Sequence, residues 1–201
     1  MKIHIETKST IRQFAVEVEG LSPLSFSKHY DAVSVPLLND KESKDAYEQR
    51  TWRNRLHFNK EGECYVPATC IKNSLVSTAQ YLGLKIPGKG NNQYAKHFER
   101  GVMCNDPMML GVHQEEVRCE TYFVPSDGQR GGGKRVRKNF PAIDPWSGTV
   151  TVLVIDDEIP NEIFARVFHE CGRFNGWGRF RPQTNGFYGR FIVKDIDLET
   201  I

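Results

Sequence analysis

The chain has 201 residues, a length that fits one large domain or two small ones. Its 39% apolar content can fill a core, and its net charge of +2 excludes a uniformly basic or acidic chain. No apolar run approaches the roughly 18 residues that a membrane-spanning helix needs, and the N-terminal segment lacks the apolar stretch of a secretory signal, so we expect a cytoplasmic protein.

The chain begins with a predicted strand and a long insertion. Phe14, Val16 and Val18 alternate with polar residues, which indicates a half-buried strand that Gly20 ends. Residues 21–66 follow and interrupt any regular pattern. They contain an irregular stretch broken by prolines, a helix over residues 40–58, and a short strand at residues 64–67.

A helix is predicted from Thr69, as its capping residue, to about Leu82, and Gly83 ends it. The remaining predicted elements are a short helix at 94–99, a strand at 117–125, a long connection at 126–148, a strand at 149–155, a helix that starts at Pro160 and is capped by Gly172, and a strand at 187–198. This order of strands and helices indicates a single α+β domain over residues 1–201, of the ferredoxin-like β-α-β-β-α-β class (as in RRM domains). The insertions at 21–66 and 126–148 are long enough to be expected to carry function.

Residues 172–191 form the most informative motif, because they combine glycine, arginine and aromatic residues and contain no acid. Glycines allow close backbone approach, arginines bind phosphate, and aromatic rings stack on unpaired bases. The expected phosphate contacts are Arg173, Arg179, Arg181 and Arg190, and the expected stacking residues are Trp177 and Tyr188. The alternative is that the glycines form tight turns and the aromatic residues fill the core.

The connection at 126–148 is the second basic segment. We expect it to act as an arm that closes over a polyanion, through Arg130, Lys134, Arg135, Arg137 and Lys138. A solvated loop is the alternative. Gly128 and the Gly133-Lys134 pair resemble a phosphate-binding loop, but Arg135 occupies the position where such a loop has Ser or Thr, which argues against nucleotide hydrolysis.

The sequence predicts no cofactor and no metal site. Its five cysteines form no C-x-x-C pair, and its histidines are not clustered with other ligand residues. His29, Asp31 and His57 are candidates for acid–base RNA cleavage, although lone surface histidines are the alternative for the two imidazoles. We therefore expect binding rather than catalysis.

Two segments resemble the RAMP superfamily of CRISPR-associated proteins. Residues 172–190 resemble its glycine-rich loop, and Tyr65–Leu75, through Pro67, Lys72 and Leu75, is similar to its first-helix entry motif. The insertion at 126–148 resembles the thumb of the backbone subunits of CRISPR effector complexes. The resemblance implies that this thumb folds over RNA, that subunits stack along the RNA as a filament, and that Lys72 at the helix start adds a phosphate contact.

The sequence therefore predicts a sequence-tolerant binder of single-stranded RNA, such as a crRNA-like guide. The resemblance implies a homo-oligomeric backbone subunit that works with other effector subunits in antiviral defence, or a phage-encoded relative of one. Two alternatives stay open: an endoribonuclease using His29 or His57, and a protein–protein module that mimics or blocks a CRISPR subunit. Single-stranded DNA also stays open, because the distinction depends on contacts to the 2′-hydroxyl.

Overall fold

The computed structural model describes residues 11–30, 41–126 and 133–200. Its centre is a four-stranded antiparallel sheet with the order β3-β7-β1-β8. The strands are β1 (Arg12–Gly20), β3 (Val102–Met103), β7 (Ser147–Val154) and β8 (Phe191–Thr200). The predicted first strand is therefore confirmed and lies inside the sheet, where it pairs with β7 on one side and β8 on the other.

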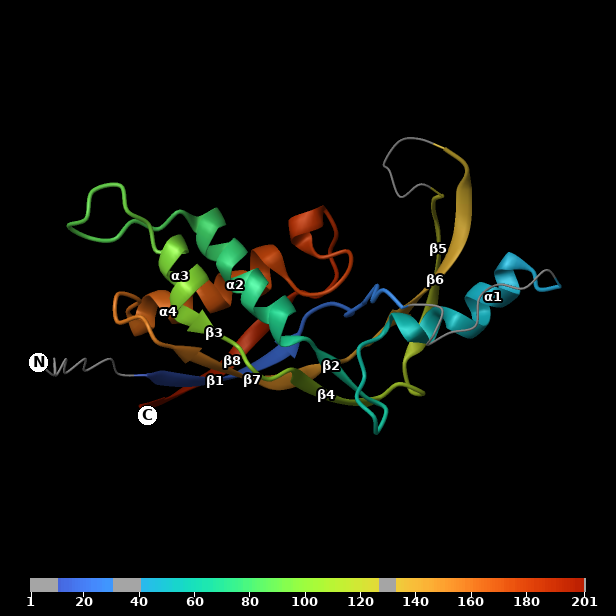
Figure 1. Cartoon of the computed structure of the whole chain (residues 1–201), viewed down its shortest axis with the longest axis horizontal. Helices are drawn as coiled ribbons and strands as arrows, with labels where there is room; N and C mark the ends of the chain where they lie inside the picture. The colour runs from blue at the N-terminus through green and yellow to red at the C-terminus, as the bar shows by residue number, and fades with distance from the viewer. Residues whose placement is uncertain (1–10, 31–40, 127–132, 201) are drawn as a thin grey trace, which may run out of the picture.

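Helices cover one face of this sheet (Figure 1). They are α2 (Ala68–Leu82), α3 (Ala95–Gly101) and α4 (Asn161–Glu170). The alternating residues Phe14, Val16 and Val18 point to the covered face and are at most 2% exposed. The ring of Phe14 stacks on Phe164 of α4, with 4.1 Å between ring centroids. Burial of one such phenylalanine contributes about 1.5–3 kcal/mol, so this layer anchors the helices to the sheet.

The structure confirms the helices predicted from Thr69 and from Pro160, although the N-cap of the first is Pro67 and the second ends differently. The helix predicted over residues 40–58 is shorter than expected and covers only Lys44–Thr51. Gly83 caps α2 in the left-handed conformation, as predicted. The predicted cap at Gly172 is wrong, because the chain continues from α4 through a π-helical turn, η2 (Cys171–Asn175), and Gly176 then takes the positive φ of 69°. Gly172 serves close packing instead, since a Cβ there would lie 2.2 Å from the carbonyl oxygen of Phe191.

The largest difference from the prediction lies between the middle strands of the sheet. The predicted strand at 117–125 is real, but it lies outside the main sheet, and the predicted connection at 126–148 contains a second strand. Strands β5 (Arg118–Pro125) and β6 (Arg135–Ala142) pair as an antiparallel hairpin that stands away from the main sheet at one end (Figure 1). The short strand β3 takes the expected place in the main sheet, so the insertion begins earlier than the sequence indicated.

The insertion after β1 lies beside this hairpin. It contains the helix α1 (Lys44–Thr51), the 3-10 turn η1 (Trp52–Arg55) and the strand β2 (Glu63–Val66). β2 pairs with β4 (Met108–His113) in a third, two-stranded sheet. Within the described residues, no helix combines the length and apolar character that crossing a bilayer would require.

Candidate nucleic-acid interface

A groove brings together the two segments that the sequence singled out. It has a volume of about 410 Å³ and lies between the first turns of α2 and the glycine-rich loop that precedes β8. Its lining residues are His57, Pro67, Thr69, Cys70, Asn73, Ser74, Gly176, Arg181 and Gln183. Pro67 is the N-cap of α2 and offers no side-chain hydrogen bond to the first turn. The positive end of the helix dipole and a guanidinium therefore border the same space.

The glycine-rich loop is held by backbone hydrogen bonds to the segment after β1. The amide of Arg179 donates to the carbonyl of Ser25 at 2.6 Å, and the amide of Gly189 donates to the carbonyl of Pro23 at 2.8 Å. A Cβ at Gly189 would lie 1.9 Å from the carbonyl oxygen of Trp177, so this glycine permits a close chain crossing. These amides are used inside the protein, which supports the turn-forming alternative for this part of the loop.

Trp177 and Tyr188 do not have the surface position that base stacking requires. Trp177 is fully buried, and its Nε1 donates to Ser74 Oγ at 2.9 Å. Tyr188 is 5% exposed, its hydroxyl lies 2.7 Å from that of Tyr122, and it donates to Glu120. Burial, followed by the hydrogen bond to Glu120, raises the pKa of Tyr188. Both aromatic side chains are part of the packing in this structure, so the expected stacking role does not fit them.

Arg179 is partly buried between two aromatic rings. Its guanidinium carbon lies 3.1 Å from the ring centroid of Phe140 and 3.8 Å from that of Phe180. Burial, with a further contribution from the charge of Arg55, lowers the pKa of Arg179 to about 10. Its Nη1 is buried and has no hydrogen-bond partner among the described residues. Through its contact with Phe140 of β6, Arg179 packs the glycine-rich loop against the hairpin.

The other predicted cations of this region occupy different positions. Arg181 lines the groove, where its Nη1 donates to the carbonyl of Gly178 at 2.9 Å. Arg173 is exposed and pairs with Glu170 at 3.3 Å, and the guanidinium of Arg190 donates to the carbonyl of Arg173. Lys72 lies away from the groove lining, and its Nζ donates to the carbonyl of Glu99 at 3.0 Å. Among the described cations of the two motifs, Arg181 alone lines the groove.

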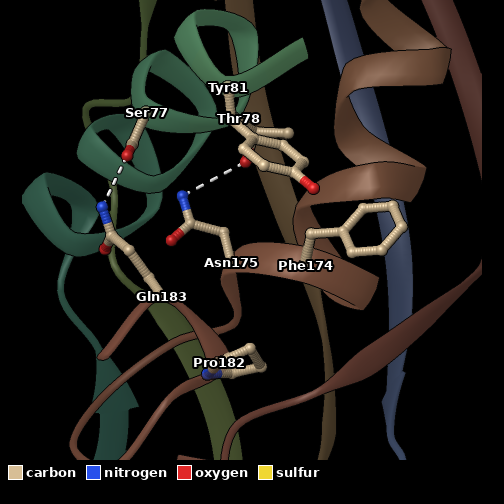
Figure 2. Close-up of a pocket in the computed structure, with 7 residues that line it drawn as sticks. All are labelled: Ser77, Thr78, Tyr81, Phe174, Asn175, Pro182 and Gln183. Carbon is tan, nitrogen blue, oxygen red and sulfur yellow. Dashed lines mark hydrogen bonds between the residues drawn. The ribbon is translucent and has the colours of Figure 1, made fainter. Parts of the chain in front are cut away.

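A second, smaller hollow adjoins the groove on the side of the C-terminal half of α2 (Figure 2). It has a volume of about 320 Å³ and lies between α2 and the glycine-rich loop. Gln183 lines both spaces. Gln183 and the other residues that line this hollow were not predicted from the sequence as site residues. Isolated amide and hydroxyl residues in a loop carry no pattern that distinguishes them from solvated ones.

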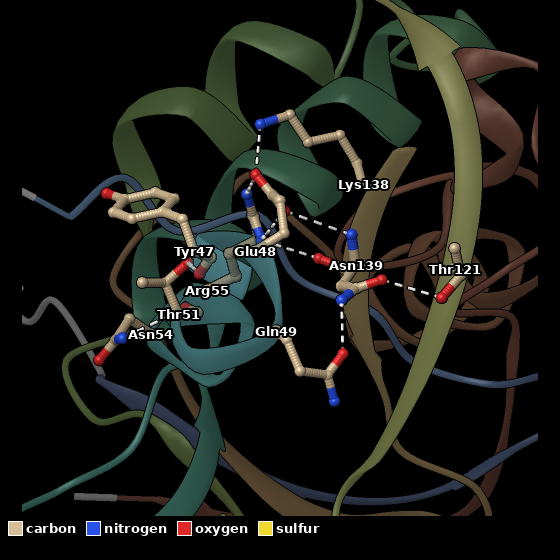
Figure 3. A network of polar contacts seen from close by, with 9 residues as sticks. All are labelled: Tyr47, Glu48, Gln49, Thr51, Asn54, Arg55, Thr121, Lys138 and Asn139. Carbon is tan, nitrogen blue, oxygen red and sulfur yellow. Dashed lines mark hydrogen bonds and ion pairs between the residues drawn. The ribbon is translucent and has the colours of Figure 1, made fainter. Parts of the chain in front are cut away.

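The hairpin presents cations differently at its outer part and at its base. Lys134, Arg135 and Arg137 are exposed, whereas Arg130 lies outside the described residues. Lys138 instead forms an ion pair with Glu48 of α1, which is 4% exposed (Figure 3). This lysine is therefore engaged in joining the hairpin to the helix.

The carboxylate of Glu48 connects α1 to the base of the hairpin. It also accepts hydrogen bonds from Arg55, at 3.2 Å, and from the amide of Asn139, at 3.3 Å (Figure 3). Burial alone raises the pKa of Glu48, but the hydrogen bonds from Lys138 and Arg55 outweigh it, so the pKa lies below its usual value. The network positions the hairpin relative to the insertion after β1.

Of the candidate catalytic residues that the structure describes, His57 lines the groove and His29 is not among its lining residues. His29 is exposed, and Asp31 lies outside the described residues. His57 lines the groove, and its ring lies edge-on to Phe26 at 5.2 Å. Burial, together with the nearby charge of Lys28, lowers the pKa of His57 to about 4. Across residues 11–30, 41–126 and 133–200, no three side chains of His, Cys, Asp or Glu are grouped so that they could hold a metal ion.

The fold of this chain is similar to one found among solved structures. No family model matches the sequence, and no curated protein matches it. Among solved structures, a chain from the cryo-EM structure of the type III-B Cmr-beta bound to cognate target RNA aligns over 94% of this chain, with a TM-score of 0.56 and 11% identity. The present chain spans 61% of that chain. The crystal structure of Cmr6 from Pyrococcus furiosus aligns over 91% of this chain and 98% of its own, with a TM-score of 0.48 and 13% identity. The protein thus has an α+β fold similar to that of the chain from the Cmr-beta structure.

Proposed function

We propose that this chain binds single-stranded RNA as a RAMP-type component of a CRISPR-type ribonucleoprotein. The observation that carries the proposal is the groove between the first turns of α2 and the glycine-rich loop, because it unites the two segments of the sequence that resemble the RAMP superfamily. The groove is bordered by a helix N-terminus and by Arg181, and both favour phosphate. The Cmr-beta structure with the similar fold holds a target RNA, which adds support.

The strand order of the main sheet supports the ferredoxin-like assignment within this proposal. β1 leads, through the insertion that carries α1 and β2, to α2, α3 and the edge strand β3, and β7 is followed by α4 and β8. This order fits a β-α-β-β-α-β unit with a second insertion, between β3 and β7, that carries β4, β5 and β6. We treat residues 1–201 as one RAMP-like domain in which that insertion corresponds to the thumb.

Binding would use two sets of cations, one in the groove and one on the hairpin. In the groove, Arg181 and the first turn of α2 would hold the backbone of the strand. On the hairpin, the exposed side chains of Lys134, Arg135 and Arg137 would close on it from outside the groove. Such phosphate contacts carry little sequence information, which fits a sequence-tolerant binder. Copies that share one RNA through their hairpins would form the expected homo-oligomer, beside other effector subunits.

The groove favours binding over RNA cleavage. Cleavage at the 2′-hydroxyl needs a base and an acid, and a histidine with a pKa of about 4 is neutral near pH 7 and a poor acid. No carboxylate is among the described residues that line the groove. The endoribonuclease alternative therefore has little support from His57. The protein–protein module stays an alternative that the absence of RNA binding would favour.

Fluorescence anisotropy with labelled single-stranded RNA and DNA tests the proposal. We expect RNA binding that weakens as salt rises, and an Arg181→Ala variant that binds several-fold more weakly. Arg166→Ala is the matched control, since Arg166 is an exposed arginine on α4, outside the loop and the hairpin. Failure of the wild-type protein to bind any single strand at low salt would overturn the proposal.

A further inference from the structure

The hollow beside the groove contains a buried hydrogen-bond acceptor without a partner. Asn175 is 4% exposed, and its Nδ2 donates to the carbonyl of Ser74 at 2.7 Å and to Thr78 Oγ1 at 3.2 Å (Figure 2). Because a carbonyl only accepts, the nitrogen must face Ser74, and this fixes the orientation of the amide. The Oδ1 of Asn175 then has no hydrogen-bond partner among the described residues. Such a buried acceptor is unfavourable until a donor meets it.

Two aromatic rings stand in solvent at the rim of the same hollow. Tyr81 is 70% exposed and Phe174 is 44% exposed, and their ring centroids lie 5.7 Å apart at an angle of 47°. They come from α2 and from the π-helical turn, so two separate elements contribute to the hollow (Figure 2). The tilt leaves the rings free of face-to-face stacking on each other. The guanidinium of Arg173 lies 5.2 Å from the centroid of the Phe174 ring, so Tyr81 offers the more open platform for a flat unsaturated ligand.

The hollow and the proposed RNA groove are neighbours that share Gln183 in their linings. The Oε1 of Gln183 accepts a hydrogen bond from Arg181 Nε at 2.9 Å, and its Nε2 donates to Ser77 Oγ at 2.6 Å. Arg181 lines the groove and Ser77 lines the hollow. The exposed side chain of Gln183 is thus the wall between the two spaces. A strand whose backbone lies in the groove has a base within reach of the hollow.

We propose that this hollow holds one nucleobase turned out of the bound strand, with an amino group on the base directed at Asn175 Oδ1. The inference rests on the RNA-binding function proposed above and adds a base preference to it. Tyr81 and Phe174 contact the ring, and the amino group supplies the donor that the buried oxygen lacks. Cytosine presents an amino group where uracil presents a carbonyl oxygen. In uracil two hydrogen-bond acceptors, this oxygen and Asn175 Oδ1, would therefore face each other without a hydrogen bond.

Oligocytidine and oligouridine of about 12 nucleotides test this preference, because they are both pyrimidine strands and differ in the group that faces the acceptor. We expect the wild-type protein to bind oligocytidine about fivefold more tightly, the equivalent of one net hydrogen bond. In the double variant Tyr81→Ala and Phe174→Ala, the affinity for oligocytidine should fall roughly tenfold and the preference should disappear. Tyr81→Phe should retain both.

The Leu198→Ala variant is the control for removal of an exposed apolar side chain, since Leu198 is 43% exposed on β8, and it should bind like the wild type. Equal binding of the two oligomers by the wild type, or full binding by the double variant, would overturn the inference. In that case Arg181→Ala would still weaken binding, and RNA binding itself would stand. Binding of neither oligomer would instead remove the RNA-binding proposal and the base site together.

Discussion

The glycine-rich loop before β8 and the β5–β6 hairpin carry similar residues but use them differently. In the loop, Arg179 is packed between aromatic rings, and the guanidinium of Arg190 donates to a backbone carbonyl. On the hairpin, Arg135 and Arg137 are exposed. Burial decides whether an arginine shapes the fold or is available to a ligand. Arg179 and Arg190 therefore hold the loop in place, and the exposed arginines of the hairpin offer accessible charge.

The largest effect should come from a change that opens the loop. In Gly189→Ala the new Cβ would lie 1.9 Å from the carbonyl oxygen of Trp177, at a residue with a φ of 66°. Overpacking and left-handed strain together should lower the free energy of unfolding by about 3–4 kcal/mol. Gly88→Ala is the matched control, because its φ is also positive and no atom lies within 4 Å of the new Cβ. It should cost about 1 kcal/mol in urea denaturation. Equal losses in both variants would show that the loop tolerates rearrangement.

At the base of the hairpin, Glu48→Gln should lower the free energy of unfolding by about 2 kcal/mol at neutral pH, because it removes the charge that meets Arg55 and Lys138. The pKa of Glu48 is lowered from 4.5 when folded, so the charged form stabilises the fold. That contribution is complete above pH 4.5 and is lost as pH falls through the folded pKa. The stability gap between wild type and variant should therefore narrow below pH 4.5, and a gap that widened there would contradict the assignment.

The hairpin cations should affect binding rather than stability. Combining Arg135→Ala with Arg137→Ala should weaken RNA affinity roughly tenfold at low salt. The slope of the logarithm of the binding constant against the logarithm of the salt concentration should become shallower by about 1.4, because two phosphate contacts to a single strand are lost. Unfolding should change by less than about 0.5 kcal/mol, because both side chains are exposed. The measurement is anisotropy over a salt series. Unchanged affinity in this variant would assign the hairpin to protein contacts instead.

The smallest effect concerns His57 in the groove wall. Its pKa of about 4 when folded lies below the ordinary 6.5, so the unfolded chain binds the proton first as pH falls. The neutral imidazole contributes stability above pH 6.5, and this is lost between pH 6.5 and about 4. Over this pH range the free energy of unfolding should fall more in the wild type than in His57→Asn. The difference should be less than about 1 kcal/mol, because the imidazole is partly exposed. A variant profile parallel to that of the wild type would show that His57 does not titrate this way.

Periodicity in the sequence was sufficient where an element buries one full face. The bounds of β1 were predicted within one or two residues because Phe14, Val16 and Val18 occur at every second position. Those of α2 were predicted equally well because Ile71, Leu75 and Ala79 recur at helical spacing. β3 was missed because two residues form no pattern. β6 was missed because its outer half carries exposed charges and only its end, from Asn139 to Ala142, is buried.

The candidate site was predictable as segments but not as individual side chains. The sequence identified the α2 entry and the glycine-rich loop, which do meet in one groove. It could not show that Trp177 lies inside the core, because Gly-Trp-Gly fits an exposed ring as well as a buried one. It also gave no sign of Asn175, whose unmatched oxygen depends on contacts with α2, a helix distant in the sequence.

Hydrogen exchange of the full chain with and without single-stranded RNA tests the central claim most directly. We predict that RNA protects the amides of the first turn of α2 and of residues 176–183, which border the groove, together with β6 of the hairpin. Protection confined to other parts of the molecule, such as the exposed face of the main sheet, with these segments unchanged, would contradict the groove as the RNA-binding site.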